Sequence, residues 1–115
     1  VLVEIHGDAT SEKQALAWYL DGRASAVLGT HTHTPTADER ILPGGTAAIT
    51  DVGMTGPRDA VIGFRPDLVI RRFRTQLHVP LEVATGPRVL CAVIVDVDPE
   101  TGRASGIERV RLEEE

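Results

Sequence analysis

The order of apolar runs at the start of the chain restricts the fold more than any other feature of the sequence. Residues 1–5 (VLVEI) and residues 26–29 (AVLG) are short apolar runs typical of strands. Residues 12–20, which lie between them, predict a helix. Strand, helix and strand in this order form the crossover unit of a parallel pair, so the predicted fold class is α/β.

The helix predicted over residues 12–20 has one apolar side and defined ends. Thr10 or Ser11 is the expected N-cap, and Gly22 is well placed to end the helix. We expect Trp18 to pack in the core rather than to bind a substrate. The apolar side is formed by three residues: Leu16, Tyr19 and Leu20.

The rest of the chain alternates short apolar segments with turns and one further helix. That helix is expected from Pro66 to Leu77. Its arginines are expected to form a solvated face or to contact a partner subunit, with phosphate binding as the alternative. Further strands are predicted at residues 40–42, 47–50, 80–84, 89–97 and 105–112. The last two form a closing hairpin, and the unbroken apolar run at residues 89–95 predicts burial on both faces of its strand.

Length, charge and cysteine content exclude several classes of protein. The chain has 115 residues, enough for one domain with a modest core, and residues 1–115 are taken as a single unit. A formal net charge of −5 argues against a long nucleic acid as partner, because such binding needs a basic face. Cys91 is the only cysteine, and its apolar neighbours indicate a buried packing role. No apolar run is long enough to span a membrane, so a cytoplasmic protein without a membrane partner is expected.

Two histidines lie two residues apart directly after the second predicted strand. His31 and His33 belong to the segment Gly29–Pro35, which leaves the carboxyl end of that strand. His6 follows the first predicted strand in the same way. The carboxyl ends of parallel strands meet at one edge of a sheet, where ligands of open α/β proteins bind. Imidazole nitrogens ligate Zn, Fe, Mn or Co, so these three histidines are candidate metal ligands.

Threonine-rich loops with exposed histidines also occur in proteins that bind no metal. On the residues alone, a solvated loop and a metal site are equally open. Nearby carboxylates are found at four positions: Asp8, Asp38, Glu39 and Asp51. We expect them to be caps and turn residues. A mononuclear site completed by Asp8 or Asp51 is a further alternative, which requires a carboxylate within bonding distance of His6 or His31.

Several segments of the chain resemble one superfamily of enzymes. Gly29-Thr30-His31-Thr32-His33 is similar to the final Gly-His-x-His block of calcineurin-like metallophosphoesterases, with a threonine inserted after the glycine. Four segments resemble the YmdB-type branch of that superfamily: His6–Lys13, Trp18–Arg23, Val27–Thr36 and Thr50–Pro57. The resemblance runs from the first residues to about Arg74, with fainter similarity through the closing strands.

The resemblance implies an activity, a substrate and a set of ligands. Members of that branch are metal-dependent phosphodiesterases that act on cyclic nucleotides, notably 2′,3′-cyclic ones. The implied cofactors are two divalent or mixed-valence metal ions, with Fe or Mn preferred and Zn as an alternative. By resemblance, His6 and His31 ligate one metal and His33 ligates the other. The remaining ligands and the catalytic histidine belong to a preceding half of the domain, so no catalytic residue is assigned in this chain and its substrate-binding residues are unassigned.

The resemblance also implies a fold. The superfamily forms an αββα sandwich of mixed sheets with flanking helices, and this chain would be its carboxyl-terminal half, ending in the closing hairpin. The chain begins with Val1 inside a predicted strand, which indicates a fragment. We therefore expect the chain by itself to be inactive or nearly so. The alternative hypothesis is a non-catalytic interaction module that keeps the fold with vestigial histidines, and a homo-oligomer is compatible with either.

Overall fold

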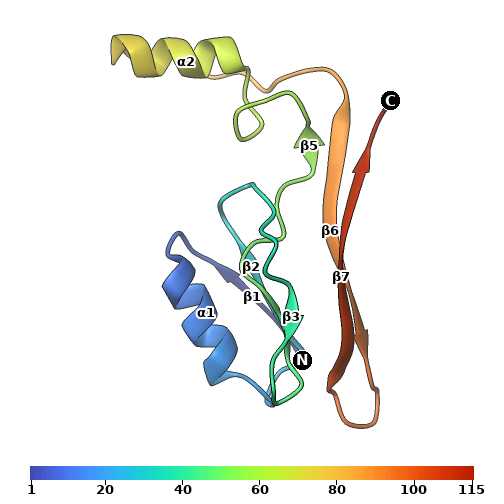
Figure 1. The fold of residues 1–115 in the computed structure, drawn as a ribbon. Coiled ribbons are helices and arrows are strands. Elements are labelled where there is room, and N and C mark those ends of the chain that lie inside the picture. The colour runs from blue at the N-terminus through green and yellow to red at the C-terminus, as the bar shows by residue number, and fades with distance from the viewer.

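The computed structural model describes all 115 residues, which form two helices and two separate sheets (Figure 1). The helices are α1 (Thr10–Tyr19) and α2 (Pro66–Thr75). The first sheet has the order β1-β2-β4-β3, formed by β1 (Leu2–His6), β2 (Ala26–Thr30), β4 (Ala47–Ile49) and β3 (Arg40–Ile41). The second sheet has the order β5-β6-β7, formed by β5 (Gly56–Pro57), β6 (Arg88–Val97) and β7 (Ala104–Glu113).

Strand β1, helix α1 and strand β2 form the predicted parallel crossover unit. Strands β1, β2 and β4 are parallel, whereas β3 is antiparallel to β4. Side chains alternate between the two faces of a strand, so Val3 and Ile5 pack toward the α1 side while Glu4 and His6 are exposed. The register pairs His6 with Thr30, the last residue of β2. Because both strands end together, the loop that follows β2 starts beside His6.

The core is divided between the two faces of the first sheet. On one face, a cluster packs α1 against the sheet and contains Ala17, Ala24, Val27, Leu42 and Ala48. On the other face, a smaller cluster joins the sheet to the β6–β7 hairpin and contains Ala26, Ala47 and Ala104. Helix, sheet and hairpin are therefore three layers, as Figure 1 shows with α1 and the hairpin on opposite sides of β2 and β3. Alanine is frequent in both clusters because the layers approach closely.

Helix α1 differs from its predicted form at its start and on its packed side. It begins at Thr10 with Ala9 as N-cap, and no side chain caps it, so the predicted capping by Thr10 or Ser11 is wrong. Lys13 and Ala17 are its buried residues. Tyr19 is 68% exposed and Trp18 is 53% exposed, so neither is a core residue. The small side chain of Ala17 allows the close contact with the sheet, and Trp18 instead lies under the Arg40 guanidinium, 5.5 Å from the ring centroid.

Two predictions for the second half of the chain are also corrected. Residues 80–84 do not form the predicted strand. Within this segment only Val83 makes a β-bridge, an isolated one with Phe64. Strand β6 is not buried on both faces, since Val89 and Cys91 are buried while Ile94 is 54% exposed. One face of the β6–β7 hairpin packs on the first sheet and the other face has no layer above it. The hairpin itself and the buried position of Cys91 are as predicted.

Helix α2 extends away from the layered part of the molecule (Figure 1). It begins at Pro66 as predicted and ends at Thr75, and Val69 is its only buried residue. Phe73 is 74% exposed. The chain has an accessible surface of 7484 Å², against roughly 6,100 Å² for a compact monomer of this mass. An open shape with exposed apolar side chains is the result, and neither helix has the length and apolar character needed to cross a membrane.

Candidate metal centre

His6 and His31 meet at the carboxyl edge of the first sheet. The Nε2 atom of His6 lies 3.0 Å from the Nδ1 atom of His31. The two rings are nearly perpendicular, with centroids 4.8 Å apart and an interplanar angle of 84°. The parallel register explains this meeting, because His6 ends β1 and His31 follows the last residue of β2. The structure thus brings together two of the three histidines that the sequence singles out.

Hydrogen bonds to the far side of the His6 ring determine which of its nitrogens is free. The Thr30 hydroxyl donates to the Glu4 carboxylate at 2.6 Å. Since that hydroxyl proton is used, Thr30 Oγ1 accepts from His6 Nδ1 at 3.0 Å. The proton of the neutral His6 ring is then on Nδ1, and the lone pair on Nε2 points at His31. A metal-ligating histidine is oriented in the same way, with its other nitrogen donating to an oxygen.

His33 lies on the same loop but not in the same cluster. Its Nδ1 atom is 3.2 Å from the carbonyl oxygen of Ile62. Because a carbonyl only accepts, Nδ1 carries the proton and the Nε2 lone pair is free to bind a ligand. Ile62 has a positive φ of 45°, as does the following Gly63 at 96°, so a tight turn presents this carbonyl. The loop before α2 therefore orients the third histidine.

The backbone of the histidine loop adopts conformations that favour glycine. His31 has a φ of 120° and His33 a φ of 64°. Such a value costs a non-glycine residue of the order of 1–3 kcal/mol, and it persists only where the surroundings fix it. Gly29, just before the loop, lies so close to the next loop that an added Cβ would be 1.7 Å from the Thr50 carbonyl oxygen. The end of β2 and the segment that follows β4 are therefore in direct backbone contact.

A buried ion pair lies behind the histidine loop. Lys13 is 2% exposed and Asp51 is 1% exposed, with 3.3 Å between Nζ and Oδ2. Burial by itself raises the pKa of Asp51, but hydrogen bonds from the N–H groups of Thr32 and Gly53 and from Lys13 outweigh it and hold this pKa below its usual value. Removing one partner of a buried pair typically costs about 3–5 kcal/mol. Sequence reasoning missed Lys13 and treated Asp51 as a turn residue.

The other carboxylates do not converge on the histidines. Asp8 has a side chain 95% exposed and lies 4.0 Å from His31 Nε2, the nitrogen that faces away from His6. Glu39 pairs with Arg109 of β7 at 2.8 Å. Asp38 accepts hydrogen bonds from Thr36 and from both the N–H and the hydroxyl of Thr50. No group of three His, Cys, Asp or Glu side chains in the chain is arranged to hold a metal ion.

The geometry of the histidine pair fits two ligands of one metal ion. Nitrogens bound at about 2.0–2.1 Å to a common metal lie roughly 3 Å apart for tetrahedral or octahedral angles. The separation of 3.0 Å between His6 Nε2 and His31 Nδ1 is in that range. One of these nitrogens donates a hydrogen bond to the other, and both would have to present a lone pair to hold one metal ion. The two histidines can therefore each supply one nitrogen to the same metal ion.

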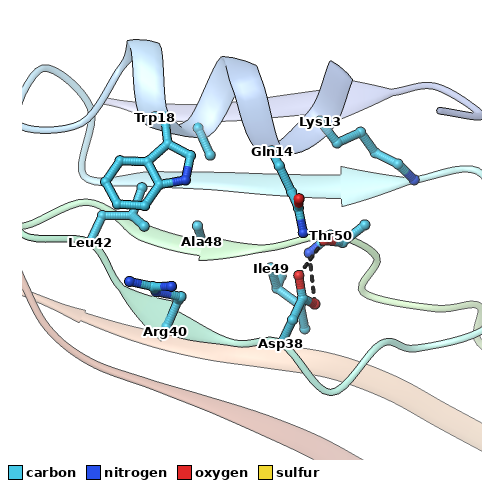
Figure 2. A pocket seen from close by; sticks show the side chains of 10 residues that line it. Lys13, Gln14, Trp18, Asp38, Arg40, Leu42, Ala48, Ile49 and Thr50 are labelled. Carbon is cyan, nitrogen blue, oxygen red and sulfur yellow. Dashed lines mark hydrogen bonds between the residues drawn. The ribbon is translucent and has the colours of Figure 1, made fainter. Parts of the chain in front are cut away.

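A groove of about 190 Å³ lies between α1 and the strands β3 and β4, away from the histidines (Figure 2). Trp18, Arg40 and Asp38 are on its walls. Figure 2 shows the Lys13 side chain extending out of this groove toward the end of β2, where its ammonium group donates to the Thr30 carbonyl at 3.1 Å. The groove itself holds no cluster of candidate ligands.

We expect Asp38 to make the chain sensitive to acid. Burial raises the pKa of Asp38, but hydrogen bonds from Thr36 and Thr50 outweigh it and hold the pKa below its usual value. A lowered folded-state pKa contributes stability above the unfolded value of about 3.9, and this contribution is lost as the pH falls. The variant Asp38→Asn should therefore be less stable at pH 7 and lose less stability between pH 5 and pH 3. Urea unfolding at several pH values measures this, and parallel curves for the two proteins would contradict it.

The fold is shared with two solved structures, one of which is described as a phosphatase. A crystal structure described as a novel phosphatase from Mycoplasma pneumoniae superimposes with a TM-score of 0.91 at 41% identity, covering 96% of this chain and 40% of that one. A hypothetical protein from Thermus thermophilus superimposes with a TM-score of 0.94 at 49% identity, covering 100% of this chain and 45% of that one. Both likenesses extend over nearly the whole chain.

The chain belongs to the family described as YmdB-like protein, whose model matches residues 1–110. It is 53% identical over 115 residues to the 2′,3′-cyclic-nucleotide 2′-phosphodiesterase of Bacillus subtilis (strain 168), covering 100% of this chain and 44% of that relative. It is 41% identical to a putative phosphatase/phosphodiesterase of Mycoplasma pneumoniae, covering 99% of this chain and 41% of the relative. The chain thus spans less than half the length of these relatives.

Proposed function

We propose that this chain forms part of a calcineurin-like, metal-dependent phosphodiesterase and supplies the histidine ligands of a dinuclear centre. The observation that carries the proposal is the 3.0 Å approach of His6 Nε2 to His31 Nδ1 at the carboxyl edge of a parallel sheet. The name of the Bacillus subtilis relative supports the phosphodiesterase class. The proposed substrate is a cyclic nucleotide of the 2′,3′ type, and the proposed metals are Fe or Mn, with Zn as the alternative.

In this proposal each histidine has a defined task. His6 and His31 bind one metal through the two nitrogens that face each other. His33 binds the second metal through Nε2, because Nδ1 is held by the Ile62 carbonyl. The bound metals supply activation of a water molecule and neutralisation of charge on the phosphoryl oxygens. The Thr30 hydroxyl keeps the His6 ring oriented and its ligating lone pair free of a proton.

The remaining parts of the site are proposed to lie outside these 115 residues. The chain spans 44% of the Bacillus subtilis relative, and its own carboxylates do not converge on the histidines. We propose that this chain is the carboxyl-terminal half of an αββα sandwich, and that the other half supplies the aspartate, glutamate and asparagine ligands and the proton-donating histidine. The chain alone is then inactive or nearly so.

A chimera tests the proposal. The matching segment of the Bacillus subtilis relative is replaced by this chain, so that the relative provides the rest of the proposed site. We expect the chimera to bind metal and to hydrolyse 2′,3′-cyclic AMP in a metal-dependent way. The variant His31→Ala in the chimera should reduce both the bound metal and the rate of hydrolysis by at least about 100-fold, because a direct ligand is lost. The isolated 115 residues should show no hydrolysis above background.

Two outcomes would contradict the proposal. Robust hydrolysis by the isolated chain, abolished by His31→Ala, would show that the chain needs no further ligands. A folded chimera without bound metal, unaffected by His31→Ala, would favour the non-catalytic interaction module instead. Metal content measured on the same samples as activity separates a lost ligand from a lost fold.

A further inference from the structure

The buried pair of Lys13 and Asp51 contacts the histidine loop on both sides of His31. Lys13 Nζ donates to the carbonyl of Thr30, the residue before His31, at 3.1 Å. Asp51 Oδ2 accepts from the N–H of Thr32, the residue after His31, at 2.8 Å. The two side chains also bind each other at 3.3 Å. His31 thus lies between two backbone groups that a single ion pair holds.

His31 needs such support because its backbone is strained. Its φ of 120° is one that side chains other than glycine rarely adopt. A change in φ at His31 would rotate the Thr32 N–H away from Asp51 and the His31 ring away from His6. If the backbone of His31 relaxed to an unstrained φ, the ring position beside His6 and the hydrogen bond to Asp51 would therefore both be lost. Asp51 is itself fixed, since its other oxygen accepts from the Gly53 N–H at 2.9 Å.

The hydrogen bonds of Lys13 and Asp51 indicate that the pair holds the histidine loop and does more than pack α1 against the sheet. A buried lysine could be used only to attach α1 to the sheet. Instead, the Lys13 ammonium donates one hydrogen bond to the Thr30 carbonyl and one to the Asp51 carboxylate. The Asp51 carboxylate in turn accepts from Lys13 and from the N–H groups of Thr32 and Gly53. The pair comes from α1 and from the segment after β4, so it joins two elements at the loop that carries two proposed ligands.

We propose that Lys13 and Asp51 are positioning residues, which fix the His31 ring beside His6 by holding the backbone on either side of it. The inference rests on the proposed metal site, because the position of the ring matters only for binding at that point. Neither residue touches the metal or the substrate in this proposal. Their effect is on the geometry of the ligand and therefore on metal affinity.

The main test removes both members of the pair together, so that neither charge is left buried alone. The double variant Lys13→Met with Asp51→Asn keeps the approximate size of both side chains. The single variant Asp51→Asn keeps an acceptor oxygen but loses the charge, and it serves if the double variant does not fold. The matched control is Leu42→Ala, since Leu42 is 4% exposed in the core beneath α1 and its side chain belongs to none of these hydrogen bonds. All variants are compared at equal unfolding free energy by adjusting temperature.

Two measurements on the 115-residue chain report on position and on binding. Nuclear Overhauser contacts between the His6 and His31 rings, with the exchange rate of the Thr32 amide, report on the metal-free loop. Titration with Mn²⁺ or Co²⁺ alone gives the dissociation constant. In the double variant we expect the ring contacts to disappear, the Thr32 amide to exchange at least about 10-fold faster, and the dissociation constant to rise roughly 10- to 100-fold. The control Leu42→Ala should keep the ring contacts and a dissociation constant within about 2-fold of the original.

The outcomes separate this inference from the proposed function. If the double variant and Asp51→Asn keep the ring contacts and the Thr32 protection, the pair does not position His31 and the inference fails. The inference also fails if Leu42→Ala loses the ring contacts to the same degree. If the original chain binds no metal while the ring contacts still depend on the pair, the positioning role stands and the metal site of the proposed function fails.

Discussion

Replacing Gly29 with alanine is expected to lower the free energy of unfolding by more than about 3 kcal/mol. An added Cβ would lie 1.7 Å from the carbonyl oxygen of Thr50 and 2.5 Å from its carbonyl carbon. Both are backbone atoms, so no side-chain rotation can relieve the overlap. The strand end and the following loop must separate, which also breaks the hydrogen bond from the Val52 N–H to the Gly29 carbonyl. Urea unfolding followed by circular dichroism measures the loss.

The matched control for Gly29→Ala is Gly7→Ala. An added Cβ at Gly7 has no heavy atom within 4 Å, and Gly7 does not have a positive φ. We expect its unfolding midpoint to stay within experimental error of the original chain. Metal titration of both variants completes the test, because the Gly29 variant moves the loop that carries His31 and should bind metal at least about 100-fold more weakly. Equal unfolding midpoints for the two variants would show that the loops at the sheet edge separate without cost.

The second large effect, on metal binding and on stability, is expected from the substitutions His31→Gly and His31→Ala. Both substitutions remove the imidazole, so both should abolish metal binding to the His6–His31 pair. They differ in backbone strain, because glycine adopts a φ of 120° without cost and alanine does not. We expect His31→Gly to be more stable than His31→Ala by about 1–2 kcal/mol. Thermal or urea unfolding of the two variants in the absence of metal gives the difference.

The control is the substitution of His78 by glycine and by alanine, for which the expected order of stability is reversed. His78 is exposed and does not have a positive φ. There the alanine variant should be the more stable one by about 0.4–1 kcal/mol, because glycine gains more freedom in the unfolded chain. An alanine variant that is also the more stable one at position 31 would show that His31 is not strained in solution. If both His31 variants lose metal binding and His31→Gly is the more stable of the two, then His31 is a metal ligand whose backbone is held in a strained conformation.

The closeness of the two segments that carry His6 and His31 could be predicted because it follows from the topology. Two apolar runs with a helix between them give a parallel pair, and residues that follow parallel strands share an edge. The helix starting at Pro66 and the closing hairpin were likewise predictable from local signals, a proline at the first helical position and a turn between two apolar runs. These features need no knowledge of distant contacts.

What the sequence could not predict depends on partners far along the chain. Lys13 belongs to a residue type that is rarely buried, and its partner Asp51 is 38 residues away. The left-handed backbone of His31 has no local signal, because histidine is not a residue that marks such a conformation as glycine does. The apolar run of β6 suggested burial on both faces, yet the number of layers around a strand is decided by elements that pack on it. Trp18 was misplaced for the same reason, since the closer packing of Ala17 turned it outward.

Strand β1 forms the open edge of the first sheet, since its only neighbour in the order β1-β2-β4-β3 is β2. An unpaired edge offers its free N–H and C=O groups to another strand. A polypeptide that extended the sheet here in the parallel direction would end next to His6, at the edge where the histidines gather. Under the proposed function, a strand added at this edge would bring its last side chains beside His6 and His31, so extending the sheet would also extend the set of candidate ligands.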